Sequence, residues 1–299
     1  MKSMRFPLLI ALSVAIIGII LGSFFDLAIS SAIASADNGF GLTISAIGPT
    51  IGFCAVSLMG GGLIALAVKG DYHIVLKILF YILAACCFGV TIYYAGGEYF
   101  GVNGFYKAAP KIVGYIIVFF PATGALVGGY FLFKDCQNKN MWIIFVTVIG
   151  LLLIALLFVI PTIKDNMHRP RYRLISKPDV DIAFHNWWQP CKNYKDLIAQ
   201  YNTSGDNFKS YPSGHTAEAS ILFVAVTFYP LANKKFAKYQ LPVFICSGVI
   251  VLLVAFARIL AAAHFLSDVS FGATIMLVLT FVANEVVMRI KPLQLQEEE

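Results

Sequence analysis

The stretch MWIIFVTVIGLLLIALLFVIP, residues 141–161, decides the fold class because it has no charged side chain over its whole length. An α-helix needs about 20 mostly apolar residues to cross a bilayer. The rest of the chain is similar: of its 299 residues, 59% are hydrophobic and 13% are charged. Soluble domains carry about 25% charged residues. The composition therefore argues against soluble, disordered, fibrous and disulfide-rich secreted proteins, and predicts an all-α integral membrane protein.

Eight apolar runs predict a bundle of about eight transmembrane helices, in one domain that comprises residues 1–299. The first run is too long for the apolar core of a signal peptide, so we expect it to be retained. The predicted spans are Pro7–Phe25, Ile47–Val68, Ile74–Ala95, Ile112–Phe133, Met141–Pro161, Pro212–Ala232, Leu241–Arg258 and His264–Val287.

Positive charges in the short loops predict the orientation of this bundle. With eight spans they all fall on one side, whereas the loop around Asp26 and Asp37 has no Lys or Arg and falls on the other. The positive-inside rule then places both termini in the cytoplasm. The net charge of +6 is spread between apolar runs, so we expect no nucleic-acid partner. The charges are Lys2, Arg5, Lys69, Lys77, Lys134, Lys139, Lys234, Lys235, Lys238, Arg289 and Lys291.

One long polar segment, residues 162–211, is predicted to lie on the outer side. A structureless loop of this length inside a compact protein is usually functional. Trp187 and Trp188 favour a position at the membrane interface, where indole rings settle. We therefore expect this outer loop to carry part of the active site.

Reactive side chains form three groups at the outer ends of the last four predicted helices. The groups are KDNMHRPRY (164–172), YPSGHT (211–216) and Arg258 followed by HFLSD (264–268). Lys164, Arg171 and Arg258 supply positive charge, and the forked guanidinium of Arg suits a phosphate. Backbone N–H groups at Ser213 and Gly214 would start a helix, where anions bind readily. These residues predict a phosphate-binding site.

The histidines in these groups predict phosphoryl-transfer chemistry that requires no metal or other cofactor. His264 and Asp268 are four residues apart and would share one helix face, so the carboxylate could hold one ring nitrogen protonated. The other nitrogen is then a nucleophile. His215 could donate a proton to a leaving oxygen. Glu218, one turn further into the predicted sixth helix, fits either a helix–helix contact or a substrate contact.

The three groups resemble the motifs of the type 2 phosphatidic acid phosphatase family, which shares its site with vanadium haloperoxidases: K-x6-R-P, P-S-G-H and S-R-x5-H-x3-D. The second motif is complete, whereas Tyr172 replaces Pro in the first and Ala257 replaces Ser in the third. Arg169-Pro170 offers another register, but Lys164 would then be too close, so we prefer Arg171. Members commonly have six helices, which implies an extra hairpin within Ile74–Phe133.

The resemblance implies a membrane phosphatase that acts on lipid phosphates or diphosphates through a phosphohistidine on His264. Candidate substrates are phosphatidic acid, phosphatidylglycerophosphate and an undecaprenyl-type diphosphate. A non-catalytic protein that binds or transports lipid phosphates is the alternative, and Ala257 is its only support in the sequence. A haloperoxidase-like vanadate enzyme is a third reading, which eight spans disfavour.

Overall fold

The computed structural model describes residues 4–98, 111–136, 138, 140–228 and 234–289, and this part of the chain contains helices and no strand. Seven of the described helical segments are long and apolar enough to cross a membrane. The predicted all-α membrane fold is confirmed, and the chain is a multi-pass membrane protein. The long helices are α1 (Arg5–Ile33), α2 (Gly39–Lys69), α3 (Ile74–Glu98), α4 (Lys111–Phe133), α5 (Met141–Ile154) with its continuation, α11 (Gln240–Leu260) and α12 (Leu266–Arg289).

The sixth predicted span is a shorter, broken helix. It consists of α9 (Gly214–Ala219) and α10 (Ile221–Phe228), and the predicted end at Ala232 lies outside the described residues. At the break, the Ser220 hydroxyl donates to the carbonyl of Thr216 at 2.7 Å. Back-bonding of this kind often bends a helix.

Helix α5 continues past its predicted end at Pro161. A π-helical turn, η1 (Ala155–Val159), leads into α6 (Ile160–Met167). Proline has no N–H to donate to the helix ladder, and this turn ends two residues before Pro161. Lys164 therefore lies on a helix, and the expectation that the outer loop begins at residue 162 is wrong.

The segment between α6 and α9 is folded rather than structureless. It contains α7 (Tyr172–Ile175), α8 (Tyr194–Gln200) and the short 3-10 helix η2 (Gly205–Phe208). A small core of its own holds these pieces together, formed by Leu174, Ile182, Cys191 and Phe208. We call residues 168–213 the cap.

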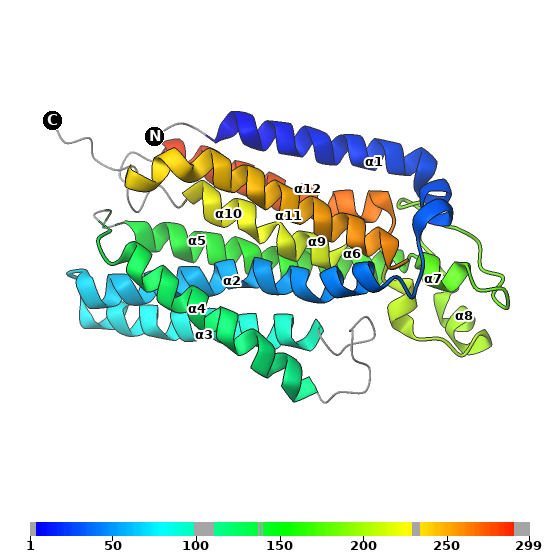
Figure 1. Cartoon of the computed structure of the whole chain (residues 1–299), viewed down its shortest axis with the longest axis horizontal. Helices are drawn as coiled ribbons and strands as arrows, with labels where there is room; N and C mark the ends of the chain where they lie inside the picture. The colour runs from blue at the N-terminus through cyan, green and yellow to red at the C-terminus, as the bar shows by residue number, and fades with distance from the viewer. Residues whose placement is uncertain (1–3, 99–110, 137, 139, 229–233, 290–299) are drawn as a thin grey trace.

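Helix α2 lies at the centre of the bundle and packs against α3 and α4 on one side and α9, α10 and α11 on the other. Helix α1 runs along α12 at the edge (Figure 1). The described ends of α1 and α12 near the termini lie at one end of the long axis, and α7 and α8 lie at the other (Figure 1). The cap therefore closes the end of the bundle opposite the termini.

Candidate active site

The three sequence motifs come together where the cap meets the bundle. The Ser213 N–H donates to the main-chain carbonyl of Asp268 at 2.9 Å, which joins the second motif to the third. The Ser210 N–H donates to the carbonyl of Arg169 at 3.1 Å and links the first motif to the same place. Arg258, His264 and Asp268 are 1%, 1% and 0% exposed, so these polar groups lie inside the protein.

Two main-chain carbonyls hold His264, one at its backbone and one at its ring. Its N–H donates to the carbonyl of Arg258 at 3.2 Å, and its Nδ1 lies 2.5 Å from the carbonyl oxygen of Ser210. A carbonyl only accepts, so Nδ1 carries the proton and Nε2 keeps a lone pair. The ring is therefore set up to act through Nε2.

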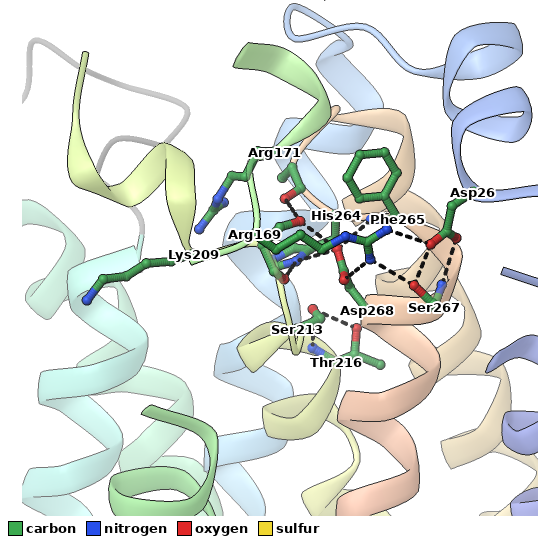
Figure 2. Close-up of polar contacts among 12 residues, drawn as sticks. Asp26, Arg169, Arg171, Lys209, Ser213, Thr216, His264, Phe265, Ser267 and Asp268 are labelled. Atoms are coloured by element: carbon green, nitrogen blue, oxygen red, sulfur yellow. Dashed lines mark hydrogen bonds and ion pairs between the residues drawn. The ribbon is translucent and has the colours of Figure 1, made fainter. Parts of the chain in front are cut away.

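Asp268 is not the direct partner of His264 that the four-residue spacing predicts. Its Oδ2 lies 3.8 Å from Nδ1, beyond hydrogen-bonding distance. The spacing argument is wrong here because α12 begins at Leu266, and His264 lies in the turn before it. Asp268 instead contacts Ser210, whose hydroxyl donates to Oδ2 at 2.5 Å. Figure 2 shows Asp268 close to His264 and to Arg169.

The carboxylate of Asp268 has further partners that fix its position. The Phe265 N–H donates to Oδ2 at 2.8 Å, which is one half of a capping box at the start of α12. The Arg169 guanidinium donates to Oδ1 at 2.6 Å. Both oxygens are thus hydrogen-bonded, and Asp268 fastens Ser210 in place under the ring of His264.

Three cations lie near enough to His264 to affect its pKa. Burial lowers the pKa of His264 well below its ordinary value, repulsion from Arg258, Arg171 and Lys164 lowers it further, and Asp268 partly opposes the shift. His264 is consequently neutral around pH 7. A neutral imidazole among positive charges suits a nucleophile whose target is an anion.

Asp206 of the cap holds one of these cations. Its carboxylate pairs with Arg171 at 3.1 Å and with Arg173 at 2.8 Å. Burial alone would raise the pKa of Asp206, but Arg171, Arg173 and Lys164 together bring it below its ordinary value. Lys164 is oriented by the cap as well, since its Nζ donates to the carbonyl of Lys209 at 2.9 Å.

The P-S-G-H motif forms the N-terminus of α9. The Ser213 hydroxyl accepts from the N–H of Thr216 at 3.4 Å and from its hydroxyl at 3.1 Å, as an N-cap residue does. The expectation that the Ser213 N–H is free for an anion is wrong, because it donates to Asp268. Gly214 and His215 follow in the first turn, and His215 Nδ1 lies 3.9 Å from Glu218 Oε2.

Two buried residues that complete this cluster were not predicted as site residues. Arg169, which the alternative register of the first motif would use for phosphate, pairs with Asp268 and with Asp26 instead. Asp26 was expected in a loop but lies in α1 and is 2% exposed. An acidic residue inside an apolar helix is costly without a partner, and this signal could have identified Asp26.

The described residues contain no group of three or more His, Cys, Asp or Glu side chains close enough to hold a metal ion. Besides Asp268, the charged side chains that affect His264 are the cations Lys164, Arg171 and Arg258. Their natural ligand is an anion with several oxygens, such as a phosphate.

Comparison with known proteins gives three similarities. A family model described as the PAP2 superfamily matches residues 141–291. Phosphatidylglycerophosphatase B of Bacillus subtilis is 32% identical over 76 residues, which are 25% of this chain and 37% of that protein's length. A crystal structure of a transmembrane PAP2-type phosphatidylglycerolphosphate phosphatase from Bacillus subtilis aligns with 91% of this chain and 96% of its own, at a TM-score of 0.37 and 17% identity.

Proposed function

The chain belongs to the PAP2 superfamily, and from this premise we propose that it is a membrane phosphatase that hydrolyses lipid phosphates or diphosphates. The observation that carries the proposal is the buried His264, whose Nδ1 is fixed by the carbonyl of Ser210, with Arg258, Arg171 and Lys164 near enough to lower its pKa. A protein that only binds a phosphate needs the cations. It does not need an imidazole whose Nδ1 is fixed so that Nε2 is left reactive.

In the first step of the proposed reaction, Nε2 of His264 attacks phosphorus. A nitrogen–phosphorus bond forms while the bond from phosphorus to the lipid oxygen breaks, and His215 gives that oxygen a proton. In the second step His215 takes a proton from water, whose oxygen attacks phosphorus. The electron pair of the nitrogen–phosphorus bond returns to Nε2, and inorganic phosphate is released.

The remaining site residues bind and position in this mechanism. Lys164, Arg171 and Arg258 neutralise the charge that spreads over the phosphoryl oxygens, which is the principal means of accelerating phosphoryl transfer. The N–H of Gly214 adds a hydrogen-bond donor. Ser213 contributes by joining α9 to Asp268 rather than by binding phosphate through its N–H.

A lipid substrate is supported by the place of the site, at the end of a membrane-spanning bundle and under a folded cap. We place both termini in the cytoplasm and the cap on the outer face, as the loop charges indicate. The printed name of the Bacillus relative favours phosphatidylglycerophosphate, and phosphatidic acid and an undecaprenyl-type diphosphate remain alternatives. The cap is the proposed selector of the head group.

The test is a phosphate-release panel with purified full-length protein in mixed micelles, over lipid monophosphates and diphosphates and with EDTA present. We expect release from at least one lipid, inhibition by vanadate, and loss of release in His264→Ala. Binding of labelled lipid without release would favour the transport alternative. A His264→Ala variant with the full rate would exclude His264 as the nucleophile.

A further inference from the structure

We infer that Asp26, on the first helix, is a positioning residue for His264 that acts through Arg169 and Asp268. The inference rests on the proposed function and deepens it. Asp26 lies well before residue 141, where the match to the family begins, so this part of the site comes from a region that the family match does not include.

The packing of α1 brings Asp26 to the start of α12. Gly18, Gly22, Asp26 and Ser30 follow one another at intervals of four residues and therefore share a helix face. A Cβ added to Gly22 would lie 2.6 Å from the main-chain nitrogen of Ser267, so the two helices touch there through their backbones. Glycine at this position permits the approach.

Both carboxylate oxygens of Asp26 accept hydrogen bonds at this contact. Its Oδ1 accepts the Ser267 N–H at 2.9 Å, which satisfies one of the free donors in the first turn of α12. Its Oδ2 accepts from Arg169 Nη2 at 2.9 Å and also from the Ser267 hydroxyl. A carboxylate from one helix thus caps the start of another.

Arg169 carries the effect of Asp26 to the catalytic side. Its guanidinium is 0% exposed and lies between two carboxylates, with Nη2 on Asp26 and Nη1 on Asp268. The Phe265 ring stacks on it with 4.3 Å between the guanidinium carbon and the ring centre. The two ends of a rigid planar fork cannot move independently, so Asp26 fixes the end that Asp268 meets. Figure 2 shows the chain of contacts from Asp26 to His264.

A purely structural role, in which Asp26 only anchors α1, makes a different prediction. An anchor would change the amount of folded protein and its thermal stability. A positioning residue changes kcat at nearly constant KM, because it does not touch the substrate and affects only the geometry of the nucleophile.

The experiment measures kcat and KM for phosphate release from phosphatidic acid or phosphatidylglycerophosphate in mixed micelles, whichever the wild type hydrolyses faster. Each rate is normalised to the folded fraction. Asp26→Asn should lower kcat about 10- to 150-fold, the effect of losing a hydrogen bond to a charged group. KM should stay within about twofold. Asp37→Asn makes the same change at an exposed position just after α1 and should behave as the wild type.

A second pair of variants keeps the inference testable if Asp26→Asn does not fold. Ser267→Ala removes the hydroxyl that touches both Asp26 and Arg169. Ser270→Ala removes a buried hydroxyl one turn further along α12, next to Gly18 and not in contact with the cluster. Ser267→Ala should lower kcat more than Ser270→Ala does, again at constant KM.

Two results would overturn the inference while leaving the proposed function intact. The first is a folded Asp26→Asn variant with the kcat of the wild type, and the second is equal kcat for Ser267→Ala and Ser270→Ala. A wild-type protein that releases no phosphate from any lipid in the panel would instead refute the proposed function, and the inference about Asp26 would fall with it.

Discussion

Replacing Ser210 by alanine separates the two ways in which His264 could be oriented. The carbonyl of residue 210, which accepts from Nδ1 at 2.5 Å, is a main-chain group and survives the change. The hydroxyl, which donates to Asp268 at 2.5 Å, is lost. Ser210→Ala therefore cuts the path from Asp268 to His264 and leaves the direct bond to the ring in place.

The expected size of the effect follows from the charge and burial of this hydrogen bond. Ser210 and Asp268 are each 0% exposed, and the acceptor is a carboxylate. A hydrogen bond to a charged group is worth about 1.5–3 kcal/mol. If all of it supports the transition state, kcat falls about 10- to 150-fold. Asp268 keeps its bonds to Phe265 and Arg169, so we expect the protein to fold.

The assay is steady-state phosphate release, with Ser176→Ala as the control because Ser176 is an exposed serine of the same cap. Ser210→Ala should lose kcat and keep its KM, and Ser176→Ala should retain both. A Ser210→Ala variant with the kcat of the wild type would refute the reasoning. It would show that the bond from Nδ1 to the carbonyl of residue 210 orients the ring without the hydroxyl that links residue 210 to Asp268.

Three further predictions concern pH, proton transfer and the cap. His264 must be neutral to attack, and burial and the nearby cations lower its pKa, so the acid limb of the kcat–pH profile should lie below pH 6.5. Lys164→Met removes one of these cations and should move the acid limb to higher pH. His215→Ala should lower kcat about 10²- to 10⁴-fold, as loss of a general acid does, with the larger losses for substrates whose leaving oxygen is more basic. Asp206→Asn should lower kcat/KM about tenfold, because the ion pair that holds Arg171 is lost; an unchanged kcat/KM would show that Arg171 keeps its position without Asp206.

The sequence was sufficient to predict the fold class because each membrane helix is a continuous apolar run, which can be recognised without knowing its neighbours in space. The uncharged run from Met141 to Pro161 and seven other apolar runs predicted the spans, and the spacing within each motif identified His264, His215 and Arg258. The ends of the helices were harder to predict. Pro161 resembles a helix stop, yet the π-helical turn before it lets the chain continue to Met167. This difference moves Lys164 from a loop to a helix.

Contacts between distant segments could not be predicted from local spacing. Asp26 and Ser267 are separated by 241 residues, and nothing near Asp26 in the sequence indicates Arg169 as its partner. The four-residue interval between His264 and Asp268 led to the wrong contact, because it assumed that the helix starts before His264. The actual partner of the His264 ring is the main-chain carbonyl of Ser210. Every residue has such a carbonyl, so the sequence does not single this one out.

The charged residues of the site form two groups, one that holds the site in position and one that is proposed to bind the substrate. Asp26, Arg169 and Asp268 form a buried hydrogen-bonded set with one more negative than positive charge, and each member is held by more than one partner. Lys164, Arg171 and Arg258 lower the pKa of His264, and in the proposed function they bind the phosphoryl oxygens of the substrate. Breaking a buried ion pair leaves an uncompensated charge and costs about 3–5 kcal/mol. Asp26, Arg169 and Asp268 are therefore held in fixed positions. A phosphate that binds the cations then meets a nucleophile that is already oriented before the substrate arrives.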